Sequence, residues 1–269
     1  MPPSPLPAPT VPPVVVGAGP AGLFAALVLA RAGLRPILLE RGRDVERRKA
    51  DVERFWSTGV LDTASNVQFG EGGAGAFSDG KLNTGTRDPR HRFILEALVR
   101  CGAPEDILID AKPHVGTDYL HVALKNLRRE LLDLGTDIRF ESRLADLTVE
   151  DGALTGAVVE GPGGTYTLPC RHLILCPGHS ARDTFEMLLH RGAALEPKPF
   201  AVGVRIEHRQ SDCDAAQYRR YAGHRACRPP AISSPATFPA VGACSPSASA
   251  PAERWWPPPR SRSGWSPTA

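Results

Sequence analysis

Three glycines early in the chain have the spacing of a loop that binds phosphate groups. Gly17, Gly19 and Gly22 directly follow a run of three valines, which favours a buried strand. In such a turn the first glycine permits a tight bend, the second lets the backbone approach a pyrophosphate, and the third lets the helix pack closely. Pro20 and Ala21 begin the helix, where free N–H groups and the positive end of the helix dipole favour anions. The pattern predicts a dinucleotide site.

A carboxylate stands where such a site would hold the adenosine. The apolar run 36–39 predicts a second strand, and Glu40 follows it directly. At the tip of that strand a carboxylate can bind two ribose hydroxyls. Arg41 could meet a 2′-phosphate, but Glu40 would repel that group, so an unmodified ribose is the expected ligand. A βαβ unit with an incidental glycine turn is the alternative.

A second glycine-rich stretch, residues 66–82, has the composition of a loop that contacts a ligand. Five glycines fall within residues 70–80, and such runs are entropically costly unless the backbone must approach something closely. Successive backbone N–H groups in such a loop can form an anion-binding concavity. Phe69, Phe77 and Leu82 argue against a flexible surface loop, which is the alternative. We expect cofactor contacts from Gly72, Gly73, Ala74, Gly75, Ser78, Asp79, Gly80 and Lys81.

The remaining pattern predicts an α/β fold with a parallel sheet and an antiparallel β-meander. Apolar residues at helical spacing indicate helices, and three alternating segments between glycine-containing turns, at 147–149, 157–159 and 166–168, indicate the meander. Further elements are expected in this order: helix 43–54, helix 89–102, helix 119–134 with Thr117 or Asp118 as its cap, strand 137–140, strand 171–178, helix 183–191, strand 201–206 and an element from Gln217 to Tyr221.

The composition is ordinary for a soluble globular protein, with 42% hydrophobic and 23% charged residues. No apolar run reaches the roughly 18 residues of a membrane span, and the proline-rich leader 1–13 lacks the pattern of a secretory signal. We therefore expect a cytoplasmic protein that has no membrane partner. The six cysteines are scattered and form no CxxC pair, which indicates reduced thiols and no metal site.

The order of these elements resembles the FAD-binding fold of the glutathione-reductase type. More specifically, the stretch 69–82, together with Phe55-Trp56 and the segment 112–118, is similar to a family of poorly characterised bacterial FAD-dependent dehydrogenases. The resemblance covers residues 14–221. It implies an oxidoreductase that uses FAD and transfers a hydride between the flavin and a small organic substrate. It indicates no particular substrate, electron donor or catalytic residue.

The resemblance also implies where each candidate residue would lie on the cofactor. It places Gly17, Gly19, Gly22 and Gly178 at the pyrophosphate, Glu40 at the adenosine ribose, residues 72–81 beside the ribityl chain and the flavin, and the backbone of Arg143 and Leu144 at the adenine.

The character of the chain changes near residue 225. The 45 residues 225–269 contain ten prolines, nine alanines, eight serines and five arginines, a composition that cannot bury a core and predicts disorder. Out-of-frame reading of a GC-rich gene yields such a composition. Codons exist for Cys244 to Pro259 that, read one nucleotide earlier, give a sequence containing Leu-Ser-Phe-Cys-Ile-Cys-Pro-Gly-Gly followed by Ala-Val-Val-Ala-Ala-Ala, and the resembling flavoproteins carry a stretch of this type. We therefore expect a frameshifted, truncated flavoprotein.

The expected organisation is a leader at 1–13, an FAD-binding or dinucleotide-binding domain at 14–208, the start of an incomplete substrate domain near 195–224, and the tail 225–269. Two alternatives to an FAD enzyme are an inactive, truncated dinucleotide-binding remnant and an NAD(P)-binding protein. We expect no nucleic-acid partner, because the tail, with five arginines against one acidic residue, contributes +4 to the net charge of +3 and so leaves the rest of the chain nearly neutral.

Overall fold

The computed structural model describes residues 10–77, 80, 82, 88–110, 115–197 and 209–224, without the side chain of residue 210, and the backbone of 236–238 and 241–244. The expected strand 201–206 and the segment 112–114 lie outside the described residues. Contacts divide the chain into two units, residues 1–195 and 196–269.

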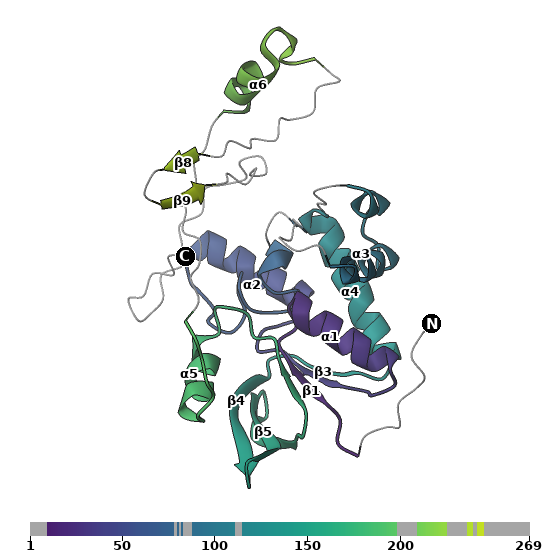
Figure 1. Ribbon diagram of the computed structural model, residues 1–269, viewed down its shortest axis with the longest axis vertical. Coiled ribbons are helices and arrows are strands. Elements are labelled where there is room, and N and C mark those ends of the chain that lie inside the picture. Colours follow the sequence, from purple (N-terminus) through teal and green to yellow (C-terminus); the bar gives the residue numbers. More distant parts are fainter. Residues whose placement is uncertain are drawn as a thin grey trace. The chain divides into compact units, whose positions relative to one another are not determined.

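A four-stranded parallel sheet lies at the centre of the first unit (Figure 1). Its order is β3-β2-β1-β7. The strands are β1 (Val14–Val16), β2 (Ile37–Leu39), β3 (Asp137–Arg139) and β7 (Leu173–Leu175). Because all four strands run in the same direction, the turns that follow β1, β2 and β7 meet at one edge of the sheet.

Alternate residues of the central strands face two separate hydrophobic cores. Val15 and Leu38 pack with helices on one face, whereas Val14, Val16 and Leu39 pack against an antiparallel sheet on the other. The helices of this unit are α1 (Pro20–Arg31), α2 (Val45–Thr58), α3 (Arg90–Arg100), α4 (Thr117–Asp133) and α5 (Arg182–His190), with the short 3-10 helices η1 (Ala74–Phe77) and η2 (Glu105–Leu108). The antiparallel sheet consists of β4 (Arg143–Glu150), β5 (Ala153–Gly161) and β6 (Gly164–Pro169).

This architecture confirms the predicted α/β fold with a parallel sheet and a meander. One predicted detail is wrong, because α4 begins at Thr117 with Gly116 as its N-cap, and no side chain caps it. The chain therefore enters α4 through a glycine with a φ of 80°, a conformation that a residue with a Cβ rarely adopts.

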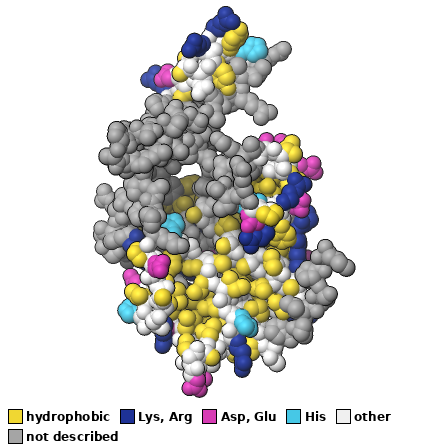
Figure 2. All heavy atoms as spheres, viewed as in Figure 1, with side chains coloured by type: hydrophobic (Ala, Val, Ile, Leu, Met, Phe, Trp, Pro, Cys, Tyr) yellow, Lys and Arg dark blue, Asp and Glu magenta, His cyan; other side chains and the backbone are white. Residues whose placement is uncertain are grey.

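Hydrophobic side chains spread over the face of the first unit that is turned toward the viewer (Figure 2). Exposed large hydrophobic residues of this unit include Val28 of α1, Leu132 of α4 and Leu175 of β7. In the part of the chain that the structure describes, no helix combines the length and the hydropathy needed to span a bilayer.

The second unit contains α6 (Gln210–Tyr218), the 3-10 helix η3 (Arg219–Tyr221) and the strands β8 (Ala236–Phe238) and β9 (Val241–Cys244). The element expected at 217–221 corresponds to the end of α6 and to η3, and the helix begins earlier than expected, at Gln210. β8 and β9 pair as an antiparallel hairpin inside the tail 225–269, where we expect no ordered structure. The other residues of that tail lie outside the described residues.

Candidate functional site

Two glycines of the first turn are required by the packing of the protein itself. Gly17 follows β1 with a φ of 98°, and a Cβ placed on it would lie 2.2 Å from the carbonyl oxygen of Cys176 at the end of β7. A Cβ on Gly22 would lie 1.7 Å from the carbonyl oxygen of Gly17. These distances are far inside van der Waals contact, so the turn closes against β7 and α1 only if both residues are glycine.

Gly19 differs, because no close protein neighbour explains it. A Cβ on Gly19 would have one heavy atom within 4 Å among the described residues, Gly73 Cα at 3.8 Å. Gly19 is also the N-cap of α1, no side chain caps that helix, and Pro20 occupies its first turn. The start of α1 therefore offers backbone N–H groups and space next to a glycine, a combination that fits a pyrophosphate.

Glu40 lies at the tip of β2 as predicted, and backbone groups already occupy much of its carboxylate. Oε2 accepts a hydrogen bond from Ala18 N at 2.7 Å, and Oε1 accepts from Gly42 N at 2.8 Å and Gly70 N at 3.0 Å. A carboxylate has about four acceptor positions. The protein's own backbone therefore occupies about three of these positions and leaves about one for a ribose hydroxyl.

The two glycine-rich stretches lie against each other. Gly72 N donates to the carbonyl of Ala18 at 2.8 Å, and a Cβ on Gly73 would lie 3.1 Å from Gly19 Cα. Gly72 and Gly73 have φ values of 82° and 61°, so the approach uses backbone conformations that favour glycine. The segment 70–73 therefore forms a second wall beside the turn at the start of α1.

Beyond Gly73 the segment continues into η1, where Ala74 is exposed and Gly75 is half-buried. Gly80 is buried, with its carbonyl accepting from Val115 N at 3.0 Å. Ser78, Asp79 and Lys81 lie outside the described residues.

A fully buried arginine binds the backbone of residues 66–71. Arg48 of α2 donates from Nε to the carbonyl of Asn66 at 2.8 Å, from Nη2 to that of Val67 at 2.9 Å, and from Nη1 to that of Glu71 at 2.6 Å. Its guanidinium also lies 4.6 Å from the ring centroid of Phe77. Burial lowers the pKa of Arg48 to about 10, against the opposing effect of Glu40 and Glu71. Arg48 remains charged at neutral pH and fixes the backbone of the loop.

Glu71 anchors the same segment to two helices. Its Oε2 accepts from Val45 N at the start of α2 and from Arg128 Nη1 of α4, both at 2.8 Å. In the described part of the chain its Oε1 has no hydrogen-bond partner, although the residue is only 1% exposed. Burial raises the pKa of Glu71 to about 7, although the Val45 N–H and the charge of Arg128 oppose this. We call Arg48, Glu71 and Arg128 the loop clasp.

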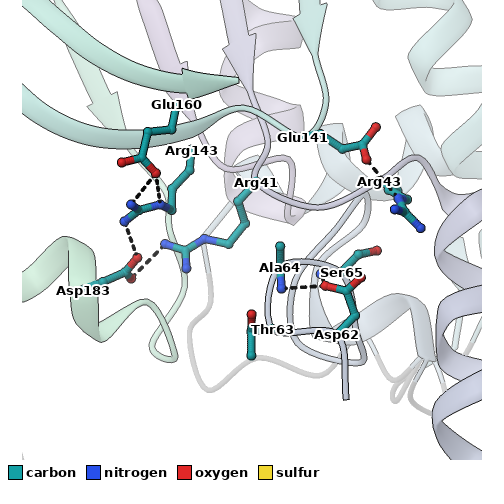
Figure 3. A pocket seen from close by; sticks show the side chains of 10 residues that line it. All are labelled: Arg41, Arg43, Asp62, Thr63, Ala64, Ser65, Glu141, Arg143, Glu160 and Asp183. Carbon is teal, nitrogen blue, oxygen red and sulfur yellow. Dashed lines mark hydrogen bonds and ion pairs between the residues drawn. The ribbon is translucent and has the colours of Figure 1, made fainter. Parts of the chain in front are cut away.

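A cavity of about 420 Å³ opens beside these loops, and we call it the arginine cavity (Figure 3). Arg41 and Arg143 point toward Asp183 across one wall. Partial burial would raise the pKa of Asp183, but hydrogen bonds and charge from Arg41 and Arg143 outweigh it and lower the pKa. The hydroxyl of Ser65, which is buried at the cavity, has no partner among the described residues. The lining residues are Arg41, Arg43, Asp62, Thr63, Ala64, Ser65, Glu141, Arg143, Glu160 and Asp183.

The arginine cavity contains two of the predicted site residues, Arg41 and Arg143. The side chain of Leu144 is 3% exposed and packs in the core between the two sheets, so only its backbone could contact a ligand, as the resemblance implies. Gly178 lies in the exposed turn between β7 and α5, with a φ of 75°. The neighbouring Pro177 Cα would be 3.4 Å from a Cβ on Gly17, so this turn reaches the first glycine turn.

Sequence reasoning missed the loop clasp and Asp183. The burial of Arg48 could have been predicted from the sequence, because its position follows the helical spacing of the buried residues Val45, Val52 and Phe55 of α2. A charged residue in such a stripe needs internal partners. Asp183 carried no comparable signal, since its two arginines come from distant parts of the chain.

Comparisons with known proteins identify the family of this chain. A family described as FAD binding domain matches residues 10–187. An uncharacterized protein of Clostridium beijerinckii is 51% identical over 212 residues, which are 79% of this chain and 39% of that protein. The chain thus spans about two-fifths of that relative's length.

Two solved structures are similar at a lower level. Thermovibrio ammonificans THI4 has a TM-score of 0.47 and 16% identity, covering 68% of this chain and 63% of that one. Aklavinone-11 hydroxylase in complex with FAD and aklavinone has a TM-score of 0.36 and 20% identity, covering 62% and 33%. The family match extends over most of the first unit and includes both glycine turns and the arginine cavity. The chain belongs to the family of FAD-binding domains, and its cofactor is FAD.

Proposed function

We propose that the protein is an FAD-dependent oxidoreductase that transfers a hydride between the flavin and a small organic substrate. The observation that carries this proposal is the contact between the two glycine-rich stretches, in which Gly72 N donates to the carbonyl of Ala18 and Gly73 lies against Gly19. This contact makes a backbone cradle with space at Gly19. The cradle suits the pyrophosphate of a dinucleotide, and the family supplies the identity of that dinucleotide.

The chain's own residues would bind and orient the cofactor. The N–H groups at the start of α1 would face the pyrophosphate, and Glu40 would accept a hydrogen bond from one ribose hydroxyl. The loop clasp would hold the segment 70–73 in place while this happens. When bound, FAD supplies the two-electron redox chemistry, and the protein contributes orientation and electrostatics.

A second candidate is an FAD-binding remnant without oxidoreductase activity. The composition of residues 225–269 favours it, as does the existence of codons for part of this tail that encode a flavoprotein-like stretch in a neighbouring frame. The nucleotide sequence of the gene tests this idea directly. If a single-base change restores the Ser-Phe-Cys-Xaa-Cys-Pro-Gly-Gly type of stretch, this chain is the frameshifted form. If no such change exists, the frameshift is excluded.

Titration of the purified chain with FAD tests the binding part of the proposal. We expect saturable binding, seen as a change in flavin fluorescence, and weaker binding of NAD+ and NADP+. Gly19→Ala should leave folding unchanged and lower FAD affinity at least about tenfold, because a methyl group would fill the cradle. Gly163→Ala is the matched control, since a Cβ there meets nothing within 4 Å.

The results separate the candidates. Wild-type protein that binds no FAD, or a Gly19→Ala variant that binds FAD as tightly as wild type, contradicts the proposed site. FAD binding with no reduction of the bound flavin by any of a panel of reduced organic substrates favours the remnant.

A further inference from the structure

One carboxylate in the arginine cavity holds two arginines from distant parts of the sequence. Asp183 Oδ1 accepts from Arg41 Nη2 and Asp183 Oδ2 accepts from Arg143 Nη1, both at 2.9 Å (Figure 3). Arg41 follows β2, Arg143 is the first residue of β4, and Asp183 lies in the first turn of α5. This carboxylate therefore joins three elements at one wall of the cavity.

Arg41 is held by contacts beyond its ion pair with Asp183. Its Nη2 also donates to Thr184 Oγ1 at 3.2 Å, and its guanidinium lies 4.4 Å from the ring centroid of Phe69. The side chain is only 15% exposed. A guanidinium held in one orientation at a cavity wall can stack on a planar base with little further loss of entropy.

The charges of the cavity favour a neutral group over a phosphate. Its lining contains three arginines and four carboxylates, so it has no excess positive charge. Glu160 also pairs with Arg143, and Glu141 pairs with Arg43. The cradle at Gly19 suits the phosphate groups of a dinucleotide better. The uncharged part of the ligand that fits the arginine cavity is therefore a nucleoside.

We propose that Asp183 is a positioning residue that fixes Arg41 and Arg143 for recognition of the adenine half of FAD. Asp183 acts through the two arginines and has no part in the redox step. This inference rests on the proposed function and names the side chains that would favour a purine over a pyrimidine.

Base selectivity tests the inference. Calorimetric titration of the full chain with ADP and with CDP compares a purine with a pyrimidine on the same ribose diphosphate. We expect wild type to bind ADP at least about tenfold more tightly than CDP. Asp183→Asn should remove most of this preference and weaken FAD binding by a similar factor, while CDP affinity changes less than about threefold.

Asp146→Asn is the matched control. Asp146 of β4 pairs with Arg191, the residue after α5, so it also joins β4 to this region, but it does not line the arginine cavity. This variant should keep the wild-type preference for ADP. Far-UV circular dichroism checks the folding of each variant.

Two further variants keep the inference falsifiable if Asp183→Asn does not fold. Arg143→Gln removes the other end of the bridge and should reduce the preference for ADP over CDP. If Asp183 acts through Arg41, Asp183→Asn should cause little further loss of the preference for ADP in a protein that already carries Arg41→Met.

Each outcome has one meaning. If wild type binds FAD but shows no preference for ADP over CDP, the inference is overturned and the proposed function stands. The same conclusion follows if Asp183→Asn and Arg143→Gln both retain the wild-type preference. An equal loss of ADP and CDP affinity in Asp183→Asn also overturns it. If wild type binds neither FAD nor ADP, the proposed function fails as well.

Discussion

The loop clasp and the arginine cavity use the same side-chain types in different surroundings. In the clasp, Arg48 is 0% exposed and Glu71 is 1% exposed, and the guanidinium of Arg48 donates to backbone carbonyls. In the cavity, the side chains of Asp183 and Arg143 are 39% and 36% exposed, and the arginines donate mainly to carboxylates.

This difference separates two tasks. A buried charge with backbone partners fixes the path of the chain, because moving the loop would leave the charge without compensation. A half-exposed ion pair contributes little to stability, since water and salt compete with it. Its task is then to hold side chains in place for a ligand. The clasp should therefore control folding of the loop, and the cavity should control which ligand binds.

The largest effect is expected from Arg48→Met. The change leaves several buried carbonyls without their donor and removes the charge near Glu40 and Glu71, so the free energy of unfolding should fall by about 3 kcal/mol or more. Urea unfolding measures the loss, and hydrogen exchange should increase across residues 66–71. Lys49→Met, an exposed change in the next residue of α2, should stay within about 0.5 kcal/mol of wild type. Equal losses of unfolding free energy in the two variants would show that Arg48 stabilises the fold no more than an exposed residue does.

The next effect concerns pH and Glu71. Its pKa is about 7 in the folded protein against a usual value of 4.5, so the folded state retains a proton that the unfolded chain releases first. The stability that this group contributes is complete below pH 4.5 and is lost as the pH rises through about 7. The lost stability should amount to about 3 kcal/mol.

Glu71→Gln isolates this contribution, because the amide does not titrate. Between pH 4.5 and pH 8 the wild type should therefore lose more unfolding free energy than Glu71→Gln does. Glu53→Gln is the control, because Glu53 is an exposed carboxylate of α2 that pairs with Lys49, and this variant should keep the wild-type loss of stability between pH 4.5 and pH 8. A parallel curve for Glu71→Gln would show that Glu71 titrates normally.

The sequence predicts local features of the site better than contacts between distant residues. The turn at Gly17 and Gly22 follows from local spacing, and the position of Glu40 follows from the strand before it. The contact between Gly73 and Gly19 could not be predicted, because nothing in either stretch specifies its distance from the other. The same holds for Asp183, which α5 brings to Arg41 through the order of the sheet.

Burial explains a second kind of failure. Arg48 lies in a run of charged residues that resembles a solvated helix face, although its spacing puts it on the buried stripe. The sequence predicts that Glu40 binds the ribose, and the structure adds three backbone N–H groups that donate to the same carboxylate. One side chain thus serves both the fold and the site, and composition does not reveal this sharing.

Gly42 connects the two regions, so Gly42→Ala should impair both. A Cβ there would lie 2.6 Å from Gly70 Cα, next to the clasp, and 2.9 Å from the carbonyl oxygen of Ala64, which lines the cavity. Overpacking of this kind costs about 1–3 kcal/mol. Urea unfolding and FAD titration should both show the loss, while Gly163→Ala changes neither. A loss confined to one measurement would mean that the two regions are independent at this residue.

The smallest effect is expected from Glu160→Gln. Glu160 Oε2 accepts from Arg143 Nε at 3.2 Å and Nη2 at 2.5 Å, but its side chain is 48% exposed and, among the described residues, it pairs with one arginine. An exposed pair of this kind contributes less than about 1 kcal/mol, so FAD affinity should change less than about fivefold. The titration should be repeated at high salt, where the difference from wild type should shrink further because the pair is screened. If Glu160→Gln instead weakens FAD binding as much as Asp183→Asn does, the summed charge of the cavity governs binding. The bridge between Arg41 and Arg143 would then have no special role.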